Sequence, residues 1–275
     1  MIGAFVNQQV AWSWHIWRTD TPAEKEAAAG YTILDRNLGA TSVTPGDVAS
    51  YGLYYQWGRK DPFVGSKDTG KDVTLNGANE AAAFGTQTAA YEKNTVEGTV
   101  YSFGVINNND NTITDCVAYT VQHPTSFIRY VATVGNSGIS TWFNSDLSNF
   151  KNLWGASGGK SVYDPCPAGY KVPVDSAVAW AGFAKADVTS SAGSFGVTLN
   201  EAFYPCSGWR DVSGMLKQVG TYAKVASATA PTHQTNILQM GYYKMTATAA
   251  SYSISFTNSG KSFIAGGLPV RCVKE

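Results

Sequence analysis

The sequence is poor in charge and has no long apolar run. Only 15% of its 275 residues are charged, against about 25% in an average soluble protein. Its 20 basic residues equal its 20 acidic ones, and because nucleic-acid binding depends on clustered Lys and Arg, this composition argues against a nucleic-acid partner. The longest apolar block, near residues 177–184, is interrupted by Gly182 and falls well short of the roughly 20 residues that cross a bilayer. We therefore expect no membrane span in this chain.

Closely spaced cysteines are also lacking. The four cysteines are Cys116, Cys166, Cys206 and Cys272. The smallest separation is 40 residues, so the chain has no Cys-x-x-Cys redox or zinc signature. The even number permits two disulfides in three pairings, and four buried thiols are compatible with it too. The three histidines lie more than 100 residues apart without a neighbouring metal ligand, so we expect no metal ion and no cofactor.

Hydroxyl, amide and aromatic side chains take the place of the missing charge. The chain has 26 Thr, 24 Ser and 16 Asn, and 13% of its residues are aromatic. A surface of this kind suits hydrogen bonding and stacking better than electrostatic capture. The 44% of apolar residues supplies enough material for a core, which argues against disorder of the whole chain. The length fits about two domains or one large one.

Local patterns predict a strand, a helix and a second strand in the N-terminal part. Residues 10–17 alternate with period two, which is typical of a strand. Residues 21–24 (TPAE) form a capping box with proline at the first helical position, and this predicts a helix that ends at Gly30. Residues 31–34 are expected to form the second strand. The aromatic run at residues 51–57 is predicted as a short helix.

The remaining patterns indicate an α+β fold. Residues 65–115 contain frequent Gly, Asn and Lys, which is typical of surface loops, and they are predicted to be an insertion. Residues 174–184 carry a cap and an apolar stripe, which predict a second main helix. Short strands are expected at residues 203–204, 240–245, 252–256 and 268–273. Two helices and many short strands in a non-repeating order favour α+β over a βαβ array.

Catalytic patterns in the sequence lack their structural context. Residues 155–159 match Gly-x-Ser-x-Gly, but no helix follows them, and a nucleophilic serine needs the sharp turn between a strand and a helix. Two Gly-Lys-Ser triplets lack the upstream glycine of a phosphate-binding loop. No pairing of a nucleophile with a base survives inspection. We therefore predict that the protein is not an enzyme, and that the segment at residues 155–159 is a flexible loop.

The C-terminal third places aromatic residues among Ser, Thr and Gly, a composition shared by antibody paratopes. Tyr and Trp offer a large rigid contact area at low entropic cost. They can equally fill the core of short strands, so we expect both exposed and buried members. The candidate ligand-binding residues are Trp209, Arg210, Tyr222, His233, Gln239, Tyr242 and Tyr243, with His233 and Gln239 as adaptable polar contacts.

Five strings carry a resemblance to a known family. They are residues 12–17 (WSWHIW), 35–40 (DRNLGA), 51–63 (YGLYYQWGRKDPF), 163–173 (YDPCPAGYKVP) and 269–273 (PVRCV). Together they resemble the C-terminal domains of fimbrillin-like and surface lipoproteins of gut Bacteroidetes. Those domains are similar to the Fibrobacter major paralogous (FISUMP) domain, whose hallmarks are Cys-Pro-x-Gly-Trp-x-x-Pro and a terminal Val-Arg-Cys. Tyr170 stands where that domain usually has Trp.

The resemblance implies a C-type-lectin-like fold, shared with formylglycine-generating enzymes and with the hypervariable proteins of diversity-generating retroelements. In that fold the N- and C-terminal strands pair, and by the family pattern Cys166 pairs with Cys272. The pairing of Cys116 and Cys206 stays open. None of the triplets that bind calcium and sugar in true C-type lectins occurs in the sequence. Since the strings run from end to end, we expect one elaborated domain over residues 1–275.

These observations predict a non-catalytic, adhesin-like binding module of an exported surface protein. It would recognise a host or bacterial surface protein or glycan through residues 205–265, and in one variant of this prediction that segment is diversified. The first residues lack the charged start of a secretory signal, so a signal or lipid anchor would lie outside this chain. The main alternative is a structural pilus or fimbrial subunit, and an enzyme on the same scaffold ranks third.

Overall fold

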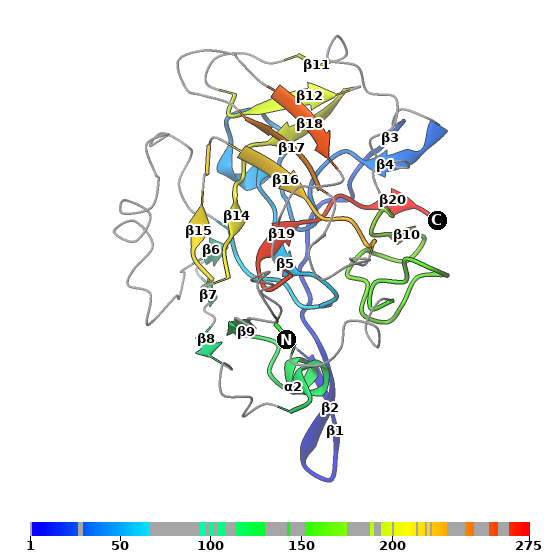
Figure 1. Cartoon of the computed structure of the whole chain (residues 1–275), viewed down its shortest axis with the longest axis vertical. Helices are drawn as coiled ribbons and strands as arrows, with labels where there is room; N and C mark the ends of the chain where they lie inside the picture. Colours follow the sequence, from blue (N-terminus) through cyan, green and yellow to red (C-terminus); the bar gives the residue numbers. More distant parts are fainter. Residues whose placement is uncertain are drawn as a thin grey trace, which may run out of the picture.

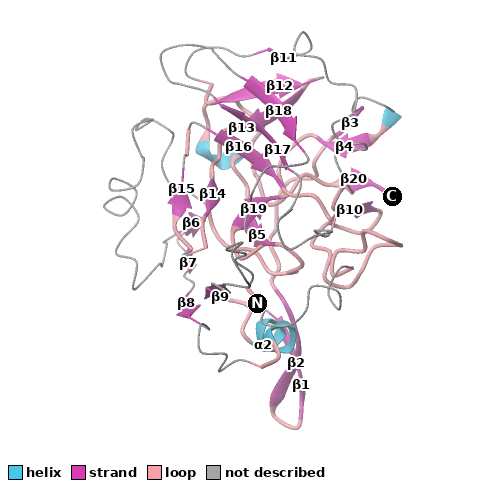
Figure 2. Ribbon diagram, in the orientation of Figure 1, coloured by secondary structure: helices cyan, strands magenta, loops and turns pink. Residues whose placement is uncertain are grey.

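The structure, a computed structural model, is built mainly from short strands (Figures 1 and 2). It describes residues 2–26, 30–65, 94–96, 99–101, 104–107, 114–129, 142–143, 152–174, 188–189, 194–199, 201–212, 214–217, 219–220, 222–229, 240–244, 253–257 and 264–275. Within these residues there is a single α-helix, α2 (Cys116–Gln122), and a 3₁₀ turn, η2 (Val48–Ser50). The fold is therefore mixed, as expected, but it is richer in strands and poorer in helix than the sequence predicts.

Strands from both ends of the chain lie side by side in two four-stranded sheets. One sheet has the order β10 (Tyr170–Lys171), β20 (Val273–Lys274), β4 (Thr32–Leu34) and β3 (Glu24–Glu26). The other has the order β15 (Leu216–Lys217), β14 (Trp209–Arg210), β19 (Gly267–Pro269) and β5 (Tyr54–Gln56). The pairing of N- and C-terminal strands that the family resemblance implies is therefore present, in β4 with β20 and in β5 with β19.

Two three-stranded sheets and three strand pairs complete the described topology. The three-stranded sheets are β11 (Val188–Thr189), β12 (Gly196–Leu199) and β13 (Ala202–Pro205), and β16 (Tyr222–Val225), β17 (Met240–Lys244) and β18 (Ser253–Thr257). The pairs are β1 (Ile2–Val6) with β2 (Gln9–Trp14), β6 (Asn94–Val96) with β7 (Thr99–Tyr101), and β8 (Gly104–Asn107) with β9 (Ser126–Arg129), of which the last is parallel. The strands expected at residues 203–204, 240–245 and 252–256 are confirmed, whereas residues 268–273 divide between β19 and β20.

Two predicted helices are wrong. The capping box at residues 21–24 does not start a helix, because Glu24–Glu26 forms β3 and pairs with β4. Residues 51–57 contain β5, whose three residues are all buried and pair with β19. In both places a partner strand outweighs the local helix signal, which is a weak preference. The helix expected at residues 174–184 lies outside the described residues except for Val174.

The helix that the structure does show, α2, was not predicted. The Asp115 carboxylate caps it by accepting a hydrogen bond of 2.9 Å from the backbone N–H of Ala118. Its sequence contains β-branched and aromatic residues, which are average helix formers. Packing therefore stabilises it: α2 lies against β2 (Figure 1), and Cys116, Thr120 and Val121 are buried.

The main core joins tryptophans from the middle of the chain with the C-terminal segment. Trp57, Trp142 and Trp154 are each 1% exposed, and the rings of Trp57 and Trp154 lie 5.9 Å apart. Each indole N–H donates to a backbone carbonyl, as from Trp142 to Trp57 at 2.7 Å. Buried indoles need such an acceptor, and here they also satisfy carbonyls that belong to no sheet.

Three arginines, Arg59, Arg210 and Arg271, are buried in the same body, and each donates to backbone carbonyls, at least one of them far from it in the sequence. Their backbone acceptors are Pro124 and Ser126 for Arg59, Val64 and Gly214 for Arg210, and Leu34 and Phe203 for Arg271. A guanidinium has five N–H donors in a fixed plane, so one side chain can join several loops. Strands of two to six residues leave many carbonyls outside any ladder, and buried carbonyls need partners.

Two of the five strings that carry the family resemblance, residues 163–173 and 269–273, meet in this body. Cys166 and Cys272 form a disulfide across 106 residues, so the implied pairing is confirmed. The buried Asp164 carboxylate holds the loop around Cys166 by accepting the backbone N–H groups of Cys166 and Val172, both at 2.8 Å. Cys116 and Cys206 are buried and do not form a second disulfide with each other.

Candidate functional site

The most distinctive group on the predicted binding segment is a lysine stacked on a tryptophan. Trp209 begins β14 and is partly buried, and the Lys224 ammonium of β16 lies 3.4 Å from the centre of its indole ring. The two strands meet at a bridge between Gly208 and Ala223. A cation this close to an aromatic face is held by attraction to the ring. Trp209 therefore fixes the position of the ammonium.

The Lys224 ammonium has no ion pair or hydrogen bond with any residue that the structure describes. Burial lowers the pKa of Lys224 to about 8, because loss of water disfavours the charged form. The group is nevertheless protonated at neutral pH. A partly buried cation without a counter-charge among its described neighbours is well placed to receive an anionic group.

Register separates the two predicted tyrosines of β17. Tyr242 lies opposite Lys224 and Tyr243 lies opposite Ala223. Ala223 is 1% exposed and belongs to the core beneath the sheet. Since successive residues of a strand alternate between faces, Tyr242 shares the sheet face of Lys224, and Tyr243 shares the face of the core.

The other predicted contacts divide into one correction and several residues that the structure does not test. Arg210 is 1% exposed, and its guanidinium donates to the carbonyls of Val64 and Gly214 inside the fold. This position offers nothing to a ligand at the surface, so we remove Arg210 from the candidate site. His233 and Gln239 lie outside the described residues. For Tyr222, Tyr242 and Tyr243 only the backbone is described.

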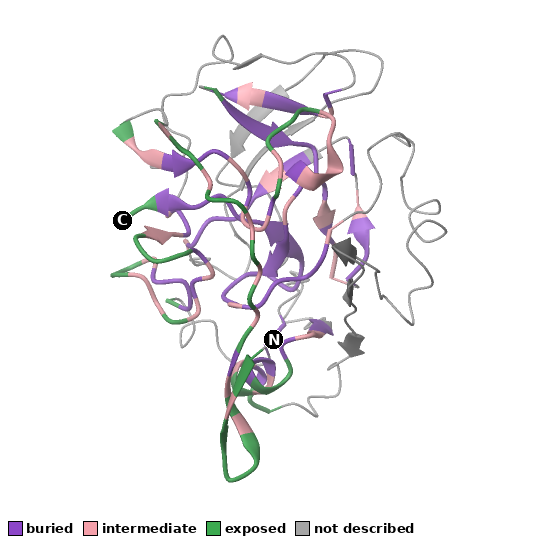
Figure 3. Ribbon diagram, turned by 180° about the vertical axis from the view of Figure 1, so that it is seen from behind, coloured by how far each residue is buried: buried purple, intermediate pink, exposed green. Residues whose placement is uncertain are grey.

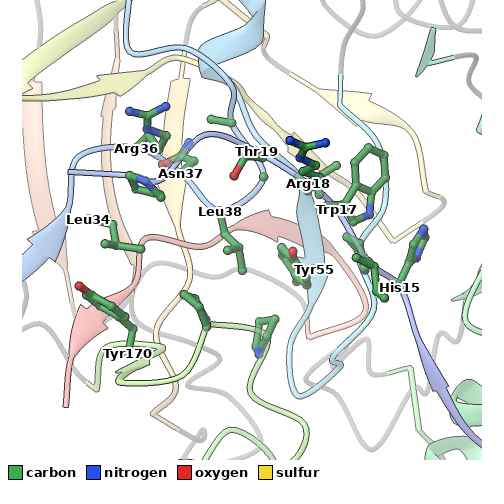
Figure 4. A pocket seen from close by; sticks show the side chains of 18 of the residues that line it. His15, Trp17, Arg18, Thr19, Leu34, Arg36, Asn37, Leu38, Tyr55 and Tyr170 are labelled. Carbon is green, nitrogen blue, oxygen red and sulfur yellow. The ribbon is translucent and has the colours of Figure 1, made fainter. Parts of the chain in front are cut away.

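A cavity of about 720 Å³ lies elsewhere, beneath the extended segment that follows β2 (Figure 4). Its walls come from residues 15–22, from the loop at residues 34–40, from β5 and from the loop at residues 165–170. The volume falls within the range of small-molecule sites, roughly 300–1,000 Å³. Four of the five strings singled out in the sequence line it in part, although nothing in their pattern predicts a cavity; they are 12–17, 35–40, 51–63 and 163–173.

Two cations that line this cavity, Arg36 and Lys60, already have carboxylate partners. Arg36 makes a two-point contact with its neighbour Asp35, at 2.7 and 3.1 Å. Lys60 binds both carboxylate oxygens of Asp61, and the Tyr170 hydroxyl donates to Glu24 at 2.5 Å. Asp20 is the only carboxylate among the lining residues. The cavity therefore presents no pair of acidic groups for acid–base chemistry.

His15 stands where the segment over the cavity leaves β2. Burial lowers its pKa to about 4, and nearby positive charges, Lys60 and Arg59 among them, act in the same direction. The imidazole is therefore neutral at physiological pH, and its ring lies 5.5 Å from that of Trp17. This environment indicates a structural role for His15.

Within the described ranges, no group of three or more His, Cys, Asp or Glu side chains could hold a metal ion. Burial also raises the pKa of the Cys206 thiol, which keeps it in the unreactive thiol form. The longest helix in the part of the chain that the structure describes has seven residues, and none there could cross a membrane.

Comparison with known proteins adds no assignment. No family model matches the chain, and neither a curated protein nor a solved structure shows significant similarity to it.

Proposed function

We propose that the protein is a non-catalytic binding module of an exported surface protein, and that it recognises an anionic group of its ligand at Lys224. The observation that supports this is the Lys224 ammonium, which Trp209 holds at 3.4 Å and which has no counter-charge among the described residues. The family resemblance supports the surface location and the C-type-lectin-like fold. Diversification of residues 205–265 belongs to the same proposal.

The ligand is a surface protein or glycan that carries a carboxylate or another acidic group. Lys224 supplies the charge, and Trp209 acts on the ligand by positioning that charge. The hydroxyl-rich and aromatic composition of the segment supplies neutral contacts around it. A single partly buried charge contact contributes on the order of 1.5–3 kcal/mol, so its loss should weaken binding by tenfold or more.

The test is a glycan array that contains acidic glycans beside their neutral counterparts, together with binding to intact cells. We expect the protein to prefer acidic members, and Lys224→Gln to lose that preference with folding intact. The matched control is Lys25→Gln, because Lys25 pairs with Glu201 at an exposed position and should leave binding unchanged. Equal binding of acidic and neutral ligands, or full binding by Lys224→Gln, would sink the proposal.

The pH dependence gives a second readout. Since the pKa of Lys224 is lowered to about 8, the positive charge is present below that pH and is lost as pH rises through it. Binding should therefore fall about tenfold between pH 7 and pH 9. Lys224→Arg keeps a charge that does not titrate in this range, so its binding should be flat over the same interval. A wild-type profile that is equally flat contradicts the assignment of Lys224.

A further inference from the structure

The hairpin β1–β2 has an unusual surface. It extends away from the rest of the described structure, beside α2 (Figures 1 and 3). Its large apolar side chains face water: Ile2 is 55% exposed, Phe5 66%, Val6 61% and Trp14 47%. Single exposed apolar residues are ordinary, but four large ones on one hairpin are typical of an interaction site.

The hairpin also has no charged side chain. The first 17 residues include no Asp, Glu, Lys or Arg, and Arg18 is the first charged residue. Among the described strands, β1 pairs only with β2, so the other edge of β1 is open. Open edges are normally protected by lysine, proline, inward charges or a β-bulge. β1 has no lysine, proline or charged side chain, and its pairing with β2 shifts register between Ala4 and Phe5.

The open edge is the part of the hairpin that the body does not hold. Two hydrogen bonds at Ser13 join β2 to the body. The Ser13 hydroxyl donates to the Val121 carbonyl of α2 at 2.7 Å, and the Lys60 ammonium donates to the Ser13 carbonyl at 2.7 Å. These contacts hold β2 against the body and leave β1 on the outside. Two-stranded hairpins are marginally stable in water, and a third strand is the usual remedy.

We propose that β1 pairs with β1 of a second copy of this chain, antiparallel and about a twofold axis at Ala4. This register places Ile2 opposite Val6 of the other copy, and Gly3 opposite Phe5. It joins two β-branched residues and lays an aromatic ring over a glycine, and both pairs are favourable across strands. The Phe5 ring already lies against the bare backbone of Gly3 within one chain, since a Cβ at Gly3 would meet it at 3.3 Å.

The absence of charged side chains agrees with a second copy as the occupant, and the exposed area limits how tightly that copy can bind. Identical uncharged edges meet without repulsion, whereas a charged partner would find no counter-charge on β1. The apolar side chains of β1 expose on the order of 300 Å², which is less than the roughly 800 Å² per partner of a standard interface. The pairing should therefore be reversible, with dissociation in the micromolar range. Because a twofold contact uses the same patch on both copies, it closes at a dimer.

Sedimentation of the full chain over a range of concentrations tests the association. We expect a monomer–dimer equilibrium, and Phe5→Lys should weaken it at least tenfold because it places like charges near the axis. Val162→Lys is the matched control, since Val162 is exposed to 71% and lies outside the hairpin. A wild-type protein that stays monomeric at high micromolar concentration, or that forms larger oligomers, overturns the proposal.

Cross-linking tests the register independently of stability. In the proposed pairing Ala4 faces its own copy, so Ala4→Cys should form a disulfide-linked dimer under mild oxidation. Ile2→Cys faces Val6 instead and should cross-link much more slowly. Equal cross-linking of both variants would indicate a parallel or non-specific contact and would contradict the twofold register, even if dimers form.

Discussion

The body of the protein and its N-terminal hairpin place charged and apolar side chains in opposite ways. The body buries Arg59, Arg210 and Arg271 to 1–2% exposure, whereas the hairpin leaves Phe5 66% exposed. Buried arginine and exposed phenylalanine are both uncommon. In the body each buried guanidinium has partners, because it donates to backbone carbonyls. In the hairpin the described residues offer none.

This difference shows which part of the molecule satisfies its backbone hydrogen-bonding groups and which part leaves them open. Arg271 illustrates the body: it donates to Asn37 at 3.0 Å and to Phe203 at 2.7 Å, and it stacks 4.1 Å from the ring of Tyr204. The body therefore solves within one chain the shortage of ladder partners that short strands create. The open edge of β1 lacks hydrogen-bond partners among the described residues. We therefore propose a partner from a second copy of the chain.

The largest expected effect is on the body, through the disulfide. Replacing Cys166 and Cys272 together by alanine opens a loop of 106 residues, and the chain-entropy relation puts the loss of stability near 4.7 kcal/mol at most. Denaturant unfolding measures it. Reductant should lower the stability of the wild-type protein and leave the double variant unaffected. A double variant as stable as the wild type would show that the body does not depend on this cross-link.

The second-largest expected effect tests whether a buried arginine stabilises the body through its hydrogen bonds. Arg271→Met keeps the bulk but removes the donors to Leu34, Asn37 and Phe203. Loss of one partner from a buried polar network costs about 3 kcal/mol or more, and the unfolding midpoint should fall accordingly. The exposed Arg18, changed to Met in the same way, should shift stability by less than about 0.5 kcal/mol. Similar losses from both would remove the contrast between buried and surface arginine.

Acid tests the junction between the two regions, at His15. Its pKa is lowered to about 4 in the folded protein but is about 6.5 in the unfolded chain. Below pH 6.5 the unfolded state therefore binds a proton that the folded state does not, and stability falls as pH drops from about 6.5 to 4. The loss amounts to at most about 3 kcal/mol. His15→Gln should lose less stability over this interval, and an identical pH profile would show that His15 does not titrate as proposed.

Sequence patterns predicted the strands better than the helices, for a physical reason. The predicted strands at residues 203–204, 240–245 and 252–256 are confirmed, because short runs with aromatic and β-branched residues between Gly and Ser turns favour strands. The capping box at residues 21–24 is local, and its segment instead joins a sheet whose partner strand β4 lies beyond Gly30. β4 pairs in turn with β20 near the other end of the chain, and pairing with a distant strand leaves no mark in a short window of sequence.

The candidate site shows the same limit. Composition pointed to Trp209, but Lys224 lies 15 positions away on another strand, and only the fold brings the two together. Arg210 could have been placed correctly: alternation sends neighbours on a strand to opposite faces, so a surface role for Trp209 argues for an interior one at Arg210. The disulfide was predictable only through the resemblance of its flanking motifs.

The smallest expected effect concerns α2, the element that supports the hairpin from the body. Asp115→Ala removes the cap that accepts the Ala118 N–H at 2.9 Å, and loss of an N-cap costs about 1 kcal/mol. Because α2 packs against β2, hydrogen exchange should quicken in both elements and not in β5, which belongs to the body. Asp115→Ser keeps a capping oxygen and should restore most of the protection. If exchange quickens in α2 alone, the stability of the hairpin does not depend on the helix. The hairpin is then more independent of the body than the contacts between α2 and β2 suggest.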